Sequence, residues 1–150
     1  MKPDINVYED ITLVILQNIP AEISFVTEVF EKIAAMGVDV DMISLSPAQS
    51  SQTSLSFTIH DDDLVKILSY TSKLNDGNIK VIVSSGNCKI SIDDADMENC
   101  PGVAARVFGI AAKVKTDIRL ITTSESQISL LVTKSDLDAA HAALNELGED

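Results

Sequence analysis

The sequence predicts an α+β chain of two similar units, each a β-α-β-β-α run that forms an antiparallel sheet with helices on one face. The main observation is an internal repeat: Val29-Phe30 recurs as Val107-Phe108, and Leu55-Ser56 recurs as Ile128-Ser129. Within each copy, apolar residues recur at helical spacing in some segments and alternate in others. The 150 residues, 45% of them hydrophobic, are also enough to bury a real core.

The elements of the first unit, residues 10–84, follow its apolar pattern. We expect a strand over 11–16, a turn over 17–20 and a helix whose apolar positions run from Ile23 to Ile33 before Gly37 ends it. Strands over 38–45 and 53–60 flank a polar loop. Aspartates at 61–63 open a second helix, because the helix dipole favours acids there, and a fourth strand covers 79–83.

A polar stretch with a glycine, residues 84–87, is the predicted linker to the second unit, residues 87–150. That unit is expected to have a strand over 89–92 and a helix over 101–115, with Pro101 at the first helical position, where a missing N–H costs nothing. Strands over 117–123 and 127–133 follow. Ser135 is expected to cap a last helix, which Gly148 ends.

The second unit has no segment that corresponds to the strand over 79–83 of the first. The extended residues 3–8 have no other evident role, so we expect them to supply the fourth strand of the second unit. The first unit is then an insertion in the second. The alternative is a frayed terminus.

Composition narrows the class of partners. The net charge is −12, which argues against nucleic acid and anionic membrane surfaces. The apolar run over 13–16 is too short to cross a bilayer, and the first four residues do not begin a signal peptide. Two cysteines form neither a disulfide framework nor a metal cluster, so we expect a cytoplasmic protein.

Two stretches carry a family resemblance. Residues 97–108 read Met-Glu-Asn-Cys-Pro-Gly-Val-Ala-Ala-Arg-Val-Phe, and residues 121–125 read Ile-Thr-Thr-Ser-Glu. Both resemble the second ACT domain in the regulatory half of aspartate kinases, and a weaker match covers the first half of the chain. The resemblance implies two ferredoxin-like βαββαβ (ACT) units, feedback sensing of lysine or threonine, and no catalytic domain in this chain.

By the same resemblance, an amino-acid effector lies between the loop before the first helix of a unit and the start of the following strand. N–H groups at the helix start take its carboxylate, and an acid across the cleft takes its ammonium group. The implied ligand-binding positions of the first unit are Ile19, Ala21, Glu22, Ser24, Phe25, Val26, Asp39, Val40 and Asp41, the last being the candidate ammonium partner. Those of the second unit are Met97, Cys100, Pro101, Gly102, Val103, Ala104, Asp117 and Ile118.

The sequence departs from the family at several of these places. Ahead of the first helix, Ala21, Ile23 and Ser24 stand where the family often has Asp, Pro and Gly, and Leu45-Ser46 replaces a common Gln-Asn. A Cβ at Ser24 narrows the approach to the helix start. In the second unit, acids replace the usual Val, Gly and Gly at Asp93, Asp94 and Asp96. These departures point to a lost lysine or threonine response or to a changed ligand.

Other chemistry has little support in the sequence. There is no glycine-rich phosphate loop, and His60 and His141 have no neighbouring cysteine, so they are structural rather than catalytic. Cys100 stands beside a helix start without a sequence neighbour that would activate it. The acidic run 93–98 offers oxygen ligands for Ca²⁺ or Mg²⁺, although such a run is usually solvated. We predict no catalysis, no metal and no cofactor.

Two functions therefore stay open. The first is an amino-acid-sensing regulatory module that acts by stabilising one arrangement of its units. The second is an interaction module that keeps the fold and its pairing but binds no effector. In both, edge strands favour association, and we expect a homodimer or a complex with a subunit that carries the kinase domain.

Overall fold

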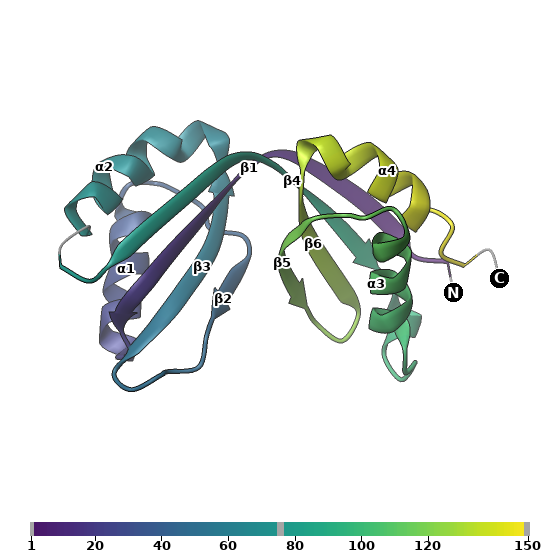
Figure 1. The fold of residues 1–150 in the computed structure, drawn as a ribbon, viewed down its shortest axis with the longest axis horizontal. Helices are drawn as coiled ribbons and strands as arrows, with labels where there is room; N and C mark the ends of the chain where they lie inside the picture. Colours follow the sequence, from purple (N-terminus) through teal and green to yellow (C-terminus); the bar gives the residue numbers. More distant parts are fainter. Residues whose placement is uncertain (1, 75–76, 149–150) are drawn as a thin grey trace. The chain divides into compact units, whose positions relative to one another are not determined.

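In a computed structural model, residues 2–74 and 77–148 are described, and contacts divide the chain into two compact units (Figure 1). We call Asp10–Ser85 the first unit. The second unit joins the residues up to Glu9 to those from Gly86 onward. Strands β1 (Asp4–Pro20) and β4 (Lys80–Asp93) therefore contribute residues to both units. The predicted α+β class, with antiparallel strands and packed helices, is confirmed.

The first unit has the strand order β2-β3-β1-β4. The central strand β3 (Gln52–His60) pairs antiparallel with β1 on one side and with the short edge strand β2 (Ile43–Leu45) on the other. Helix α1 (Ile23–Ala35) comes before β2, while η1 (Asp61–Asp63) and α2 (Leu64–Leu74) follow β3. Alternate strand residues form one core with both helices, so the helices cover one face of the sheet.

The aromatic centre of that core is Phe57, which is fully buried on β3. Its ring meets the ring of Phe30 from α1 edge to face, with 5.7 Å between the ring centroids. Val29 and Ile33 lie on the same buried stripe of α1, as helical spacing predicts. Gly37 then takes a positive φ of 74°, a backbone conformation that suits glycine just past a helix end.

The second unit has the strand order β1-β4-β6-β5, with β5 (Ile118–Thr123) at the edge. Strand β6 (Gln127–Thr133) pairs antiparallel with both β4 and β5. The turn η2 (Ala95–Met97) leads to α3 (Val103–Lys113), and α4 (Lys134–Leu144) follows β6. Ile5 and Val7 of β1 pack against the core of this unit, and the Lys89 Nζ lies 4.8 Å from the ring centroid of Tyr8.

The chain continues as a strand through both predicted breaks, so the turn over 17–20 is wrong, whereas the boundary between the units does lie within 84–87, between Ser85 and Gly86. Residues 17–20 form the end of β1 rather than a turn. Asn18 takes a φ of 62° and the pairing with β3 shifts between Leu16 and Ile19, so this feature is an irregularity within the ladder. The predicted linker at 84–87 lies inside β4, where Gly86 has a φ of 72°.

Another expected strand, over 38–45, is much shorter than predicted, since β2 holds three residues. The segment before it is held to β3 in part by a side chain. The backbone N–H of Met42 donates to the Oγ1 of Thr58 at 2.9 Å, while the Thr58 N–H donates to the Met42 carbonyl at 3.0 Å. A side-chain acceptor thus replaces one carbonyl of a regular ladder at Met42.

Helix ends differ slightly from the predictions. Helix α3 begins at Val103, so Pro101 lies in the preceding turn and Gly102 is the N-cap residue. Helix α4 begins at Lys134 with Thr133 as N-cap, and the hydroxyl of Ser135 lies 3.2 Å from the Thr133 hydroxyl instead of capping the helix. Within the described residues, none of the helices is long and apolar enough to span a membrane.

Candidate functional site

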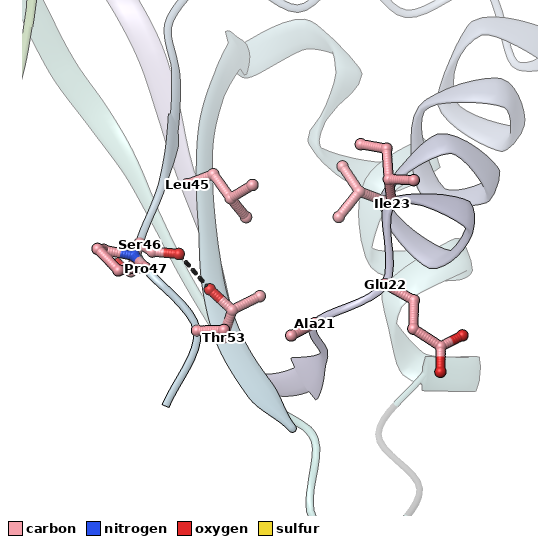
Figure 2. A pocket seen from close by; sticks show the side chains of 9 residues that line it. Ala21, Glu22, Ile23, Leu45, Ser46, Pro47 and Thr53 are labelled. Carbon is pink, nitrogen blue, oxygen red and sulfur yellow. Dashed lines mark hydrogen bonds between the residues drawn. The ribbon is translucent and has the colours of Figure 1, made fainter. Parts of the chain in front are cut away.

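A pocket of about 410 Å³ opens beside the start of α1 in the first unit (Figure 2). It is formed by the end of β1 and first turn of α1 on one side, and by the end of β2, the following loop and the start of β3 on the other. Its lining residues are Ala21, Glu22, Ile23, Val26, Leu45, Ser46, Pro47, Ala48 and Thr53. The volume lies within the range of small-molecule sites, roughly 300–1,000 Å³.

The α1 wall of the pocket is an uncapped helix start. Glu22 is the N-cap residue with an extended backbone, and its side chain makes no capping hydrogen bond. The Glu22 carbonyl accepts from the N–H of Phe25 at 3.0 Å, and the N–H of Ala21 donates to the Ser51 carbonyl at 2.9 Å. The N–H groups of Ile23 and Ser24 have no acceptor within the helix, as in any first turn, and they are suited to an anionic group.

The opposite wall is fixed by hydrogen bonds to its backbone. The Thr53 hydroxyl donates to the Ser46 carbonyl at 2.5 Å, and the Ser46 N–H donates to the Ser54 carbonyl at 3.0 Å. Leu45 pairs with Leu55 in the ladder between β2 and β3. Its side chain is nevertheless half exposed and points across the pocket toward Ile23 (Figure 2). The wall therefore presents an aliphatic side chain held on a rigid backbone.

Charge in the pocket is confined to one place. Among the described residues that line it, Glu22 alone is ionisable, and its carboxylate points away from the space between Ile23 and Leu45 (Figure 2). The pocket thus has an aliphatic space between α1 and β2, and the Glu22 carboxylate lies outside that space, beside the helix start.

The structure brings together part of the predicted first-unit site. Ala21, Glu22 and Val26 line the pocket, and Ser24 lies exposed in the first turn of α1. Two other predicted residues belong to the core of the first unit. Ile19 is fully buried in that core, and the partly buried Phe25 packs against the same core. The predicted acids and their neighbour are not among the lining residues; these are Asp39, Val40 and Asp41.

Sequence reasoning did not assign Ile23, Leu45 or Thr53 to the site. Ile23 and Leu45 were nevertheless visible as departures from the family pattern at the helix start and after the second strand. Thr53 carried no signal, because its place in the lining depends on the loop that precedes β3. Departures from a family pattern were thus the signal that could have found the aliphatic space.

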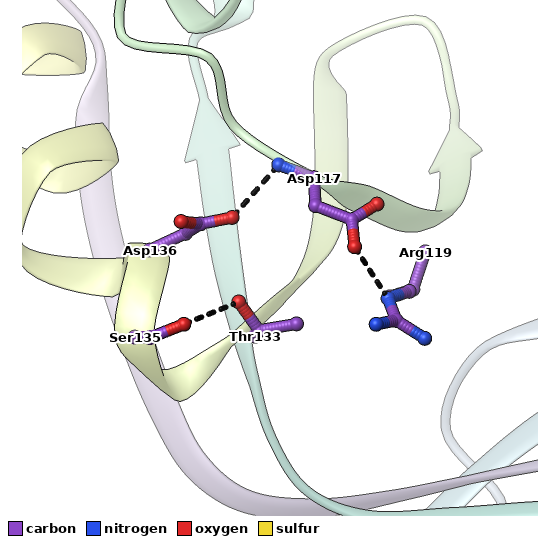
Figure 3. Close-up of polar contacts among 5 residues, drawn as sticks. All are labelled: Asp117, Arg119, Thr133, Ser135 and Asp136. Atoms are coloured by element: carbon purple, nitrogen blue, oxygen red, sulfur yellow. Dashed lines mark hydrogen bonds and ion pairs between the residues drawn. The ribbon is translucent and has the colours of Figure 1, made fainter.

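In the second unit, Asp117 is the acid among the predicted ligand-binding positions, and it already makes contacts within the protein (Figure 3). The Arg119 Nε donates to the Asp117 Oδ2 at 3.0 Å, and the Asp136 Oδ2 accepts from the backbone N–H of Asp117 at 2.8 Å. Asp117 remains exposed, so this ion pair is weak, but it fixes the direction of the side chain. Ile118, the next predicted residue, packs partly buried against the core.

The helix start of the second unit is built around Gly102, whose φ of 90° puts it in the left-handed region. The N–H of Arg106 donates to its carbonyl at 3.0 Å. Met97 and Val103 are buried in the core. The other predicted residues of this loop and helix are exposed to solvent: Cys100, Pro101, Gly102 and Ala104.

The acidic run after β4 is held by protein donors. Asp93 accepts from the Gln127 Nε2 at 2.7 Å and from the Ser91 hydroxyl at 3.0 Å, and the Asp94 Oδ1 accepts from the N–H of Asp96 at 2.8 Å. The Asp94 Oδ2 is buried without a partner. Across residues 2–74 and 77–148, no three His, Cys, Asp or Glu side chains are placed to hold a metal ion. The run therefore shapes the turn into η2.

Comparison with known proteins finds similarity to ACT domains and to aspartokinases. Residues 90–147 match the family model described as "ACT domain". The aspartokinase of Geobacillus stearothermophilus is 31% identical over 140 residues, which is 93% of this chain and 34% of that protein. The chain spans about a third of the length of the aspartokinase sequences it matches.

Solved structures agree over nearly all of the chain. The ligand-free regulatory subunit of aspartate kinase from Thermus thermophilus has a TM-score of 0.86 at 26% identity, and the match covers 96% of both chains. Aspartate kinase from Synechocystis has a TM-score of 0.88 at 30% identity, covering 95% of this chain and 26% of that one.

Proposed function

Because the chain resembles the regulatory region of aspartate kinases, as residues 97–108 predicted, we propose that it binds a free amino acid and thereby regulates an aspartate kinase catalytic domain. In this proposal the chain itself regulates and does not catalyse. The observation that carries the proposal is the pocket of the first unit, which places an uncapped helix start beside an aliphatic space, with the exposed Glu22 side chain on the same turn.

Those groups suit the constant part of an α-amino acid. Its carboxylate is placed at the N–H groups of Ile23 and Ser24, where the helix dipole favours negative charge. Its ammonium group pairs with the exposed Glu22 side chain, once that side chain turns toward the ligand, rather than with the predicted Asp41. Its side chain then extends between α1 and β2. Lysine or threonine is the effector that the resemblance implies. The aliphatic side chains in the lining instead favour an effector with an apolar side chain.

The test is a binding titration of the intact chain against single amino acids, followed by thermal unfolding. A ligand at a hundred times its dissociation constant stabilises the folded state by about 2.7 kcal/mol, which raises the midpoint by roughly 5–10 °C for a chain of this size. The variant Glu22→Gln is expected to lose most of this shift, whereas Glu31→Gln, on the exposed side of the same helix, keeps it. A folded chain that no amino acid shifts would contradict the proposal.

A second function, pairing without an effector, is favoured by edge strand β2. Both of its apolar side chains, Ile43 and Leu45, are about half exposed. Such an edge invites another strand or chain, either a second copy in a homodimer or a subunit with a kinase domain. Sedimentation at micromolar concentration should show a dimer that Ile43→Lys weakens and Val65→Lys, at an exposed site on α2, does not. A 16.1 kDa monomer alone would count against pairing of copies.

A further inference from the structure

We infer that the pocket of the first unit selects amino acids with an uncharged aliphatic or thioether side chain, such as leucine, isoleucine, valine or methionine, over lysine. This inference rests on the proposed function and names the class of effector. Its starting point is a facing pair of aliphatic side chains, Ile23 and Leu45, at the end of the pocket away from the Glu22 carboxylate (Figure 2).

The pair is unusually open to water for residues of its type. Ile23 is 76% exposed, although Val26, Val29 and Ile33 of the same helix are buried, and Leu45 is 50% exposed on edge strand β2, where Ile43 is exposed to a similar degree. A ligand side chain that fills the space between them removes apolar surface from water on two sides at once. A hydrophilic side chain in the same place would leave that surface without a favourable contact.

The polar groups of the pocket are already assigned or badly placed for a second charge. Glu22 takes the ammonium group that every amino acid carries, so the side-chain ammonium of lysine would have no carboxylate among the described lining residues. An ammonium group moved to an apolar environment without a partner is strongly disfavoured. Lysine is therefore expected to bind by its constant part alone, with its side chain directed into solvent.

Threonine is disfavoured for a related but weaker reason. The Ser46 carbonyl, a polar group of the β2 side, already accepts from the Thr53 hydroxyl at 2.5 Å. A ligand hydroxyl that enters the aliphatic space finds no comparable built acceptor there. An apolar pocket discriminates against an added hydroxyl by roughly 100-fold at most, so threonine is expected to bind more weakly than valine without being excluded.

The second unit does not repeat the aliphatic pair. By the internal repeat, Pro101 stands where Ile23 does and Thr123 stands where Leu45 does. A proline ring and a threonine present less aliphatic surface than an isoleucine and a leucine. The inference therefore also fixes the stoichiometry at one apolar amino acid per chain.

The experiment is isothermal titration of the full chain with leucine, isoleucine, valine and methionine, and with lysine, threonine and alanine for comparison. The best apolar amino acid is expected to bind at one site, with an affinity at least tenfold above those of alanine and lysine, since one methylene in a fitted pocket changes affinity by roughly 10–200-fold. Leu45→Thr, which installs the second-unit residue, and Ile23→Thr should each weaken this binding about tenfold or more.

Val65→Thr is the matched control. Val65 is 78% exposed on α2 and is not among the residues that line the pocket, so this variant makes the same kind of change at a surface site. It should bind as the unchanged chain does. Urea unfolding of all three variants establishes that they are folded, which their exposed positions favour.

Two results would overturn the inference, and they are distinguishable from each other. If lysine binds at least as tightly as the apolar amino acids, and Leu45→Thr leaves that binding unchanged, the selectivity is wrong while amino-acid binding stands. If a folded chain binds none of the panel, the proposed function fails together with the inference.

Discussion

Replacing Thr58 by valine tests how the segment before β2 is held. Thr58 is fully buried, and its Oγ1 accepts the N–H of Met42 at 2.9 Å. Valine keeps the shape of threonine but removes the acceptor, so the N–H of Met42, itself 3% exposed, would be left buried and unpaired. Such a group costs about 1–3 kcal/mol. The two backbone hydrogen bonds of Thr58, to Met42 and Asp41, are not directly affected.

That cost is a substantial part of the stability of a domain, about 5–15 kcal/mol in total. Concentrated on one segment, it corresponds to a roughly 5- to 150-fold increase in local opening, since each 1.4 kcal/mol is a factor of ten. Amide hydrogen exchange read at Met42 is the direct assay, and urea unfolding gives the global change. The matched control is Thr58→Ser, which keeps the hydroxyl and loses only a methyl group.

We expect the Met42 amide to exchange faster in Thr58→Val than in Thr58→Ser, while amides in the middle of β3 change only as much as the global stability does. Equal exchange at Met42 in both variants would refute the assignment of the threonine hydroxyl as its acceptor. Because the segment leads directly into β2, the valine variant should also weaken binding at the pocket wall that carries Leu45.

Two further predictions concern pH and backbone conformation. Burial, and then the nearby Glu28 carboxylate, raise the pKa of Tyr70 above its usual value of 10.0. The folded state therefore holds the Tyr70 proton more tightly than the unfolded state does. The stability that this gives is fully present below about pH 10 and is lost as the pH rises through the folded pKa. In urea unfolding at alkaline pH, the free energy of unfolding should therefore fall less with pH in Tyr70→Phe than in Tyr8→Phe. Gly102 has a φ of 90°, and a Cβ there would meet open space, so the strain of Gly102→Ala is in the backbone and should destabilise the fold by about 1 kcal/mol. Gly109→Ala, in the middle of α3, should instead stabilise the fold by about 0.5–1 kcal/mol. Equal changes of the two variants in urea unfolding would contradict the conformational argument.

The class of fold was predictable because it rests on periodicity. The apolar stripe of α1 and the alternation along β3 each specify which side faces a core, and the repeat showed that the pattern occurs twice. The turn predicted over 17–20 was wrong for a local reason. Asn18 and Pro20 are typical of turns, yet Ile19 between them is fully buried and pairs with Thr53 in the ladder. Tertiary pairing there overrides the local preference.

The candidate site divided along similar lines. Its helix start was predictable from the resemblance, because Ala21 and Glu22 occupy fixed positions relative to the first apolar residues of α1. The facing wall depends on where the loop after β2 returns to the sheet, and no short-range pattern specifies that path. Asp41, an attractive partner on the basis of sequence, has its backbone tied to Thr58 and is not part of the lining.

The second unit is built from two separate segments of the chain, and this determines how it can be expressed on its own. A fragment that begins at Gly86 would start within β4 and would omit the residues up to Glu9, leaving an edge of the sheet uncovered. The matched family segment, residues 90–147, has the same omission. The first unit, by contrast, is one uninterrupted stretch. A splice that joins Glu9 directly to Gly86 keeps every strand of the second unit, and such a minimal protein is the form in which that unit can be studied without its neighbour.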